Sequence, residues 1–127
     1  MSIAETVSLA SSCVRKKVGC IIVKNNNIIS IGYNGTITGF DNVCELPDGT
    51  TSPEVLHAEA NAILKCAENG TSCSEADLYT TLSPCLACAK TIIQAGIKKV
   101  YFSKLHSCKD GLDLLDKAGV TNTLIIL

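Results

Sequence analysis

Two cysteines three residues apart stand just after a proline, in the segment Ser83-Pro84-Cys85-Leu86-Ala87-Cys88. Ser83 is a typical helix N-cap and Pro84 a typical first helical residue, so the pattern predicts that Cys85 and Cys88 lie in the first turns of a helix. Side chains three residues apart share one helix face, and the positive end of the helix dipole favours thiolates there. The pair could therefore give a metal ion two thiolate ligands.

Further ligands are expected from His57-Ala58-Glu59, at the start of another helical segment. One histidine with two cysteines is a three-ligand set, which is typical of a catalytic zinc site, whereas structural zinc uses four protein ligands. Thiolates with an imidazole favour Zn²⁺ over Mg²⁺ or Ca²⁺. Zinc lowers the pKa of a bound water from about 15.7 to about 7. The sequence thus predicts His57, Cys85 and Cys88 as zinc ligands and Glu59 as the catalytic group that moves the water proton.

The cysteine pair has two other interpretations. It could be a redox pair, or it could be half of a structural zinc site whose fourth ligand is His106, Cys44 or Cys108. The redox interpretation leaves His57-Ala58-Glu59 without a role. Catalytic zinc accounts for both motifs, and the combination H-x-E with P-C-x-x-C is the signature of zinc deaminases.

Hydrophobic patterning predicts the elements that must hold these residues. It predicts helices over 2–12, 57–66, 84–95 and 110–117, and strands over 18–23, 28–33, 76–82, 99–103 and 120–127. Asn25-Asn26-Asn27 is a turn signal that joins the first two strands as an antiparallel hairpin. Residues 32–52 form a loop long enough to be functional.

This order of elements predicts an α/β fold. Strands separated by helices are joined by right-handed crossovers and run parallel. We expect a three-layer α/β/α sandwich whose five-stranded mixed sheet has an antiparallel first hairpin, its remaining strands parallel and helices on both faces. Ligands of such sheets bind outside the carboxyl ends of the parallel strands, where Cys85 and His57 are expected.

Size and composition restrict the class of protein further. The 127 residues fit one domain, 1–127, that can bury a real core. A net charge of −1 without a basic stripe favours a small-molecule partner over a polynucleotide. No apolar run is long enough to span a membrane, and the polar N-terminus does not look like a signal peptide. We therefore expect a cytoplasmic protein with reduced cysteines.

Three blocks of the chain resemble the deoxycytidylate (dCMP) deaminases of phages and eukaryotes, within the zinc-dependent cytidine deaminase superfamily. The blocks are Lys17-Val18-Gly19-Cys20-Ile21-Ile22 through Gly32-Tyr33-Asn34-Gly35, His57-Ala58-Glu59-Ala60-Asn61-Ala62-Ile63, and Thr81-Leu82-Ser83-Pro84-Cys85-Leu86-Ala87-Cys88-Ala89-Lys90 with Ile97-Lys98-Lys99. The zinc motif alone would fit the whole superfamily. The Gly-Tyr-Asn-Gly block and the asparagine after His-Ala-Glu are what resemble the dCMP branch.

The resemblance implies a cytidine deaminase-like fold and the hydrolysis of dCMP to dUMP and ammonia, which feeds dTMP synthesis. It also implies a homohexamer that dCTP activates and dTTP inhibits, each with Mg²⁺. Carried over onto this chain, it assigns four residues to substrate binding and five to phosphate or effector binding. The first set is Asn34, Asn61, Ser83 and His106, and the second is Arg15, Lys17, Gly32, Tyr33 and Gly35.

Several positions depart from the family pattern or have a plainer interpretation. Where relatives have a longer insertion with ligands of a second zinc, residues 41–54 are short and contain no histidine. We expect Cys13 and Cys44 to be free thiols, with a second metal as the alternative. His106 replaces a tyrosine that stacks on the base, and could equally be a surface residue. Tyr33 could pack under the loop, and Asn61 could face solvent.

Rival functions remain open at this stage. The chain could deaminate dCTP, free cytidine or another cytosine nucleotide, although its near-neutral charge argues against adenosine in tRNA. It could also be a zinc-stabilised nucleotide-sensing module without turnover. Glu59 argues against that, because a purely structural site needs no such carboxylate.

Overall fold

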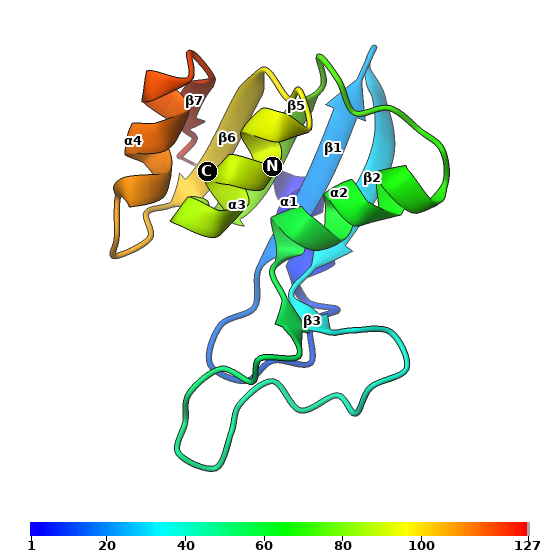
Figure 1. Cartoon of the computed structure of the whole chain (residues 1–127), viewed down its shortest axis with the longest axis vertical. Coiled ribbons are helices and arrows are strands. Elements are labelled where there is room, and N and C mark those ends of the chain that lie inside the picture. The colour runs from blue at the N-terminus through cyan, green and yellow to red at the C-terminus, as the bar shows by residue number, and fades with distance from the viewer. Residues whose placement is uncertain (127) are drawn as a thin grey trace.

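A five-stranded sheet in the order β2-β1-β5-β6-β7 forms the centre of the computed structural model, which describes residues 1–126 (Figure 1). Strand β1 is antiparallel to both of its neighbours, and β5, β6 and β7 are parallel to one another. The strands are β1 (Gly19–Lys24), β2 (Asn27–Tyr33), β5 (Asp77–Leu82), β6 (Lys99–Lys104) and β7 (Thr121–Leu124). The predicted mixed sheet is confirmed. The predicted last strand ended at residue 127, which lies outside the described residues.

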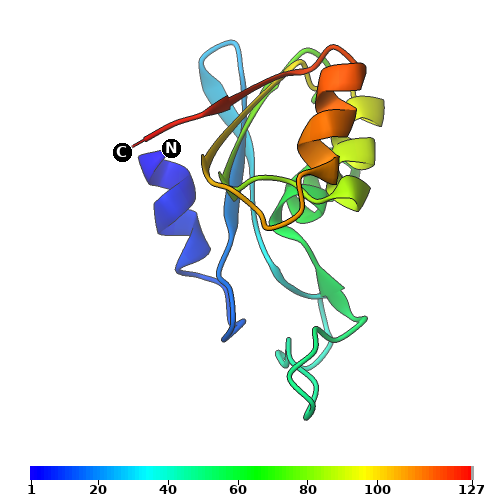
Figure 2. The ribbon, with the colours of Figure 1, turned by 90° about the vertical axis from the view of Figure 1, so that its left-hand side faces the viewer.

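The two faces of the sheet are covered unequally (Figure 2). Helices α2 (Ala58–Glu68), α3 (Leu86–Gln94) and α4 (Asp110–Lys117) lie on one face, and the short helix α1 (Ser2–Ser8) lies alone on the other. Helix α1 is shorter than predicted because Ser8 Oγ donates to the carbonyl of Glu5 and Ser11 Oγ donates to that of Asn34. Among residues 1–126, no helix has both the length and the apolar character needed to cross a bilayer.

The hairpin that begins the sheet turns as the asparagine run predicts. Asn25 and Asn26 have φ angles of 52° and 63°, in the left-handed region that asparagine tolerates best among residues with a side chain. Strand β2 is an edge strand, and its Ile28 and Ile31 are exposed. Helices α2 and α1 contact β2 from the two faces of the sheet, as the predicted fold requires, but they cover this edge strand only partly.

The main core lies between the sheet and the three helices on its larger covered face. Its fully buried large side chains include Ile22, Leu78, Ile92, Val100 and Leu115. Three cysteines pack with them as small hydrophobes, as expected from their apolar surroundings: Cys20, Cys66 and Cys73. This core fixes α2 and α3 against the sheet, and both helices begin at the same end of it (Figure 1).

A long loop, residues 37–54, extends away from the sheet between two short strands (Figure 1). Strands β3 (Gly35–Thr36) and β4 (Val55–Leu56) pair antiparallel at its base. The predicted strand over 28–33 is confirmed by β2, so the loop predicted for 32–52 begins later than expected and also contains the short strand β3. Within residues 37–54, only Cys44 and Ser52 are buried, so apolar packing contributes little to holding this loop.

Gly32 allows the backbones of β2 and α2 to touch. A Cβ atom at this position would lie 2.5 Å from the carbonyl oxygen of Ala58 and 2.6 Å from the amide nitrogen of Ala62. Both obstacles are backbone atoms in the first half of α2, which cannot move without the helix. Gly32 therefore sets the distance between the sheet and the helix that begins at His57.

Substituting Gly32→Ala should lower the free energy of unfolding by about 1–3 kcal/mol, because the new methyl group pushes α2 away from β2. Urea unfolding followed by circular dichroism measures the change. Gly35→Ala is the matched control, since nothing lies within 4 Å of a Cβ built there. Equal destabilisation by the two substitutions would contradict the close-packing role of Gly32.

Candidate metal centre and active site

The N-termini of α2 and α3 meet at one edge of the sheet and carry the predicted metal ligands. His57 is the N-cap residue of α2, and Cys85 is the N-cap residue of α3. Cys88 lies within the first turn of α3. The expectation that Ser83 caps α3 and Pro84 begins it was wrong, because Cys85 is still extended, with φ −72° and ψ 172°, and the helix starts at Leu86.

The three predicted ligands lie at the spacing of a zinc site. Nδ1 of His57 lies 3.4 Å from the Sγ atoms of both Cys85 and Cys88, and the three ligand atoms all lie within 4.8 Å of one another. Zn–S bonds of about 2.3 Å and Zn–N bonds of about 2.0–2.1 Å in a tetrahedron separate sulfur from nitrogen by about 3.5 Å. Both the donor atoms and their spacing therefore fit zinc.

Hydrogen bonds link the three predicted ligands to one another. The Cys88 thiol and the His57 ring donate hydrogen bonds to the Cys85 sulfur, and these bonds hold the pKa of Cys85 far below that of an ordinary thiol. The same bond to Cys85, together with burial, raises the pKa of Cys88. Hydrogen bonding to Cys85 also raises the pKa of His57. A divalent cation in this position would take the place of the protons in these hydrogen bonds.

Glu59 lies beside this group in the first turn of α2 and is almost completely buried. Burial raises its pKa to about 7, while a hydrogen bond from its own backbone N–H and the charge of His57 lower it. A carboxyl group with a pKa near neutrality can both accept and release a proton at physiological pH. Its position and pKa fit the predicted proton carrier.

A cavity of about 210 Å³ opens in front of the metal ligands. Seven residues singled out from the sequence line it: Arg15, Asn34, His57, Glu59, Ser83, Cys85 and His106. Other lining residues come from the segment after α1 and from the long loop, among them Lys16, Val18, Glu45, Thr51 and Val55. The cavity thus lies between the metal ligands and two irregular segments of the chain.

Asn34 orders one wall of this cavity. Its Oδ1 accepts from the Val18 N–H at 2.8 Å, and its Nδ2 donates to the carbonyl of Lys16 at 2.8 Å. Its own carbonyl accepts from Ser11 Oγ at 2.7 Å. Asn34 therefore fixes the backbone of residues 16–18 at the cavity, and its second Nδ2 hydrogen is the donor left for a ligand.

Ser83 and His106 also line the cavity and contact each other. The buried Ser83 hydroxyl accepts from the His106 N–H at 2.7 Å. Nδ1 of His106 accepts from the Cys108 N–H at 3.0 Å, so the proton of the neutral ring is on Nε2. Ser83 thus positions His106, and the His106 ring has a hydrogen-bond donor available.

The remaining predicted binding residues lie outside the cavity lining: Lys17, Gly32, Tyr33, Gly35 and Asn61. Asn61 donates to the carbonyl of Tyr33, and the ammonium of Lys65 lies 5.6 Å from the centre of the Tyr33 ring. These contacts join α2 to the end of β2. Gly32 is required for packing, and no ligand contact is needed to explain it.

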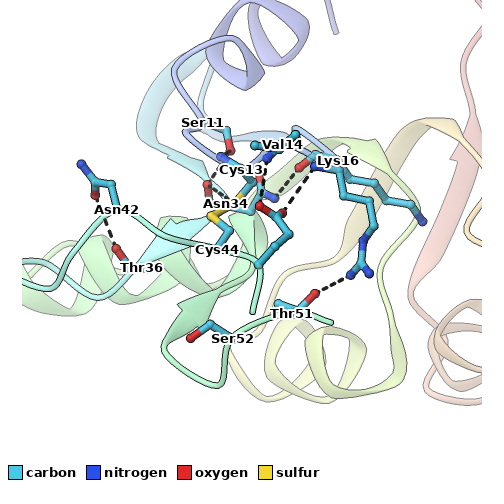
Figure 3. The surroundings of a disulfide bond; sticks show 12 residues. Ser11, Cys13, Val14, Lys16, Asn34, Thr36, Asn42, Cys44, Thr51 and Ser52 are labelled. Atoms are coloured by element: carbon cyan, nitrogen blue, oxygen red, sulfur yellow. Dashed lines mark hydrogen bonds between the residues drawn. A yellow bond between two sulfur atoms is a disulfide. The ribbon is translucent and has the colours of Figure 1, made fainter. Parts of the chain in front are cut away.

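Cys13 and Cys44 form a disulfide bond, so the expectation of free thiols was wrong (Figure 3). Their Cα atoms lie 5.2 Å apart, within the range that a disulfide spans, although the two residues are 31 positions apart in sequence. The fold brings the segment after α1 against the long loop, a contact that periodicity does not reveal. The other six cysteines are free.

Sequence reasoning missed several residues of the cavity wall. Lys16 lies within the short basic run Arg15-Lys16-Lys17, and the structure selects Lys16 over Lys17 as a lining residue. Glu45 and Thr51 lie in an irregular loop, where no pattern marked them. Their role depends on the path of that loop, because Glu45 accepts from the backbone N–H groups of Val14 and Arg15.

The sequence is similar to known proteins along nearly its whole length. Residues 1–104 match the cytidine and deoxycytidylate deaminase zinc-binding region. The chain is 38% identical to the deoxycytidylate deaminase of Enterobacteria phage T4, with 94% of this chain and 84% of that protein covered. It is 39% identical to ComE operon protein 2 of Bacillus subtilis, across 95% of this chain and 66% of that protein.

The fold is similar to a solved structure with bound nucleotides. That structure is dCMP deaminase from the cyanophage S-TIM5 in complex with dCMP and dUMP. It superposes with a TM-score of 0.95 at 47% sequence identity and covers 98% of this chain and 92% of that chain. The likeness extends over the sheet, the helices and the long loop together.

The purified protein should contain about one zinc per chain, because His57, Cys85 and Cys88 form a three-ligand set of the catalytic type, whereas Cys13 and Cys44, which lie near Glu45, are joined in a disulfide. Cys88→Ser should remove most of that zinc, since the buried thiolate is lost while the hydroxyl remains a poor zinc ligand. Metal analysis of dialysed protein measures the content, with circular dichroism to verify folding. Cys108→Ser, at an exposed free cysteine, should retain zinc. Full zinc content in folded Cys88→Ser would exclude this site.

Proposed function

Because the chain belongs to the cytidine and deoxycytidylate deaminase family, we propose that it catalyses the hydrolysis of dCMP to dUMP and ammonia with zinc. The observation that carries this proposal is the His57, Cys85 and Cys88 set with the buried Glu59 beside it, at the end of one cavity. The nucleotides bound to the similar cyanophage enzyme support dCMP as the substrate. We place this activity in the cytoplasm, or in the host cytoplasm if the protein is viral.

Glu59 carries the protons of the proposed reaction. A zinc ion held by His57, Cys85 and Cys88 supplies the Lewis acidity that makes water nucleophilic near neutral pH. Glu59 takes a proton from the water that attacks C4 of the base. It delivers this proton to N3, then takes the remaining water proton from the hydroxyl now on C4 and delivers it to the amine, which leaves as ammonia. The pKa near 7 that burial gives Glu59 suits both steps.

Ser83, His106 and Asn34 orient the nucleoside in this proposal. The Nε2–H of His106 and the free Nδ2 hydrogen of Asn34 are hydrogen-bond donors at the cavity. His106 can also lie flat against the base, although more weakly than the larger ring of a tyrosine. Asn61 acts from outside the cavity, through the Tyr33 carbonyl that it holds.

The 5′-phosphate is proposed to bind Arg15 and Lys16. These are the two cationic side chains among the cavity-lining residues. The Arg15 guanidinium is already held by the carbonyl of Gly49 at 2.8 Å and by the hydroxyl of Thr51. Its position is thus set before a ligand arrives, which lowers the entropic cost of binding.

Replacing Glu59 by Gln should reduce kcat by about 10²–10⁴-fold, because the amide cannot carry a proton. Zinc content should stay at the wild-type level, since Glu59 is not among the three ligands. Ammonia release from dCMP measures the rate, and metal analysis is the control. Undiminished turnover by the Gln variant would contradict the assignment of Glu59 as the proton carrier.

Lys16→Ala should raise KM for dCMP about tenfold, the loss expected for one charge-assisted hydrogen bond, and should leave KM for deoxycytidine nearly unchanged. Steady-state rates on dCMP, dCTP and deoxycytidine measure this preference. Lys98→Ala is the control, because this exposed lysine lies outside the cavity. If kcat/KM were higher for deoxycytidine or dCTP than for dCMP, that compound and not dCMP would be the preferred substrate.

We further propose that the chain assembles as a homohexamer and responds to dCTP and dTTP, each with Mg²⁺. The residues assigned to these effectors are Lys17, Gly32, Tyr33 and Gly35, outside the cavity. Tyr33, half-buried and next to Lys65, offers the aromatic surface for such a ligand. This proposal rests on the resemblance of the Gly-Tyr-Asn-Gly block.

Added dCTP should increase, and dTTP decrease, the initial rate at dCMP concentrations below KM. The dCMP saturation curve should be sigmoidal, since hexameric sites would couple. Initial rates with each triphosphate and Mg²⁺ measure the effect, and ATP is the control for chelation of the metal. Hyperbolic curves that neither triphosphate changes would exclude this regulation.

A further inference from the structure

The Cys13–Cys44 disulfide joins the two irregular segments that wall the cavity (Figure 3). Both cysteines line the cavity, together with His57 and Glu59. Both are also nearly fully buried, with exposed fractions of 2% and 3%. We propose that this disulfide is a redox-controlled clamp that holds the cavity wall in its nucleotide-binding form and weakens nucleotide binding when it is reduced.

The disulfide is the strongest link between residues 13–16 and the long loop. The other links are hydrogen bonds from Val14 and Arg15 to Glu45, and from Arg15 to Gly49 and Thr51, and all of them are exposed to water. Hydrogen bonds in such surroundings contribute little net free energy. The pairing of β3 with β4 holds the base of the loop. Since the rest of the loop packs few apolar side chains, breaking the disulfide leaves only these weak hydrogen bonds to hold it against residues 13–16.

The clamp acts on the residues proposed to bind phosphate. Cys13 lies two and three positions before Arg15 and Lys16, and its N–H donates to Ser11 Oγ, which itself donates to the Asn34 carbonyl. Cys44 precedes Glu45, which accepts from the Arg15 N–H. When the loop moves away, Arg15 loses Gly49, Thr51 and Glu45 together. The residues proposed to bind phosphate, Arg15 and Lys16, are then no longer held in a fixed position.

The metal ligands are independent of this clamp. His57, Cys85, Cys88 and Glu59 lie at the starts of α2 and α3, which are fixed by the main core. Reduction should therefore raise KM and leave kcat nearly unchanged. This split between the two kinetic constants distinguishes a clamp on nucleotide binding from general damage to the fold.

The redox step is an ordinary thiol–disulfide exchange. The first thiolate of a dithiol attacks one sulfur of the Cys13–Cys44 bond and forms a mixed disulfide with that cysteine. The second thiolate of the dithiol then attacks the dithiol sulfur of the mixed disulfide and releases the cysteine. Two electrons and two protons pass to Cys13 and Cys44, and the dithiol leaves as its own disulfide. Disulfides of proteins in reducing compartments are usually transient or redox-sensing, which suits such a role.

Linkage makes the effect reciprocal. If reduction weakens nucleotide binding, bound nucleotide must oppose reduction by the same factor. Occupation of the cavity also blocks the approach of a dithiol to sulfurs that line it. This second consequence is measurable without any turnover. The inference rests on the proposed function for its choice of dCMP as the ligand and for the assignment of Arg15 and Lys16 to the phosphate.

The test compares oxidised protein with protein reduced by dithiothreitol in zinc-containing buffer. Alkylation of thiols followed by peptide mass spectrometry reports the state of Cys13 and Cys44. Reduction should raise KM for dCMP by about fivefold or more and change kcat by less than about twofold. Saturating dCMP should slow the appearance of alkylated Cys13 and Cys44. The double variant with Cys13→Ser and Cys44→Ser should show the higher KM with or without dithiothreitol, while Cys108→Ser should respond as the wild type does.

Two results would overturn the proposal. One is an equal KM for the oxidised and reduced proteins in a preparation where mass spectrometry shows complete conversion. The other is a second zinc per chain bound by Cys13 and Cys44 in the isolated protein, because zinc-bound thiolates are not a disulfide. Slower reduction in the presence of dCMP, without any ammonia release, would support the clamp and contradict the deaminase activity, so the two failures are distinguishable.

Discussion

The meeting of two helix N-termini at one edge of the sheet is the constraint on which the site depends. His57 is the N-cap residue of α2, and Cys85 is the N-cap residue of α3. The backbone at each helix start therefore determines where these two side chains lie. The partial positive charge of both helix starts favours thiolate at Cys85 and Cys88. This placement needs α2 to lie at a fixed distance from the sheet, which the contact of Gly32 with Ala58 and Ala62 provides.

Seven of the eight cysteines fall into three groups with different surroundings, and the eighth, Cys108, is free and exposed. Cys85 and Cys88 are the proposed thiolate ligands of a metal, and Cys20, Cys66 and Cys73 act as small apolar side chains in the core. Cys13 and Cys44 act through a covalent bond. Burial raises the pKa of the Cys20 thiol, whereas hydrogen bonds lower that of Cys85. The same side chain is thus inert or reactive according to its surroundings.

Local sequence was sufficient for the elements and for the metal ligands. Asn25 and Asn26 define the hairpin turn, and the helix 110–117 begins and ends as its pattern predicts. The positions of His57, Glu59, Cys85 and Cys88 at the starts of two helices were enough to predict that these side chains come together. Only part of the cavity wall could be predicted in this way, including Asn34 and His106. Its Lys16, Glu45 and Thr51 and the Cys13–Cys44 bond depend on how two irregular segments meet, and no period in the sequence encodes that contact.

The burial of Glu59 has a consequence for the evolution and engineering of this fold. A carboxylate withdrawn from water makes the folded state less stable than an apolar side chain of similar volume would, because the protein replaces its lost hydration incompletely. Selection for heat resistance alone would therefore favour Leu or Met at position 59 and abolish proton transfer. Burial of Glu59 thus lowers the stability of the start of α2 but supports its proposed role as proton carrier. A substitution chosen only to stabilise the fold at this position would remove the proposed activity.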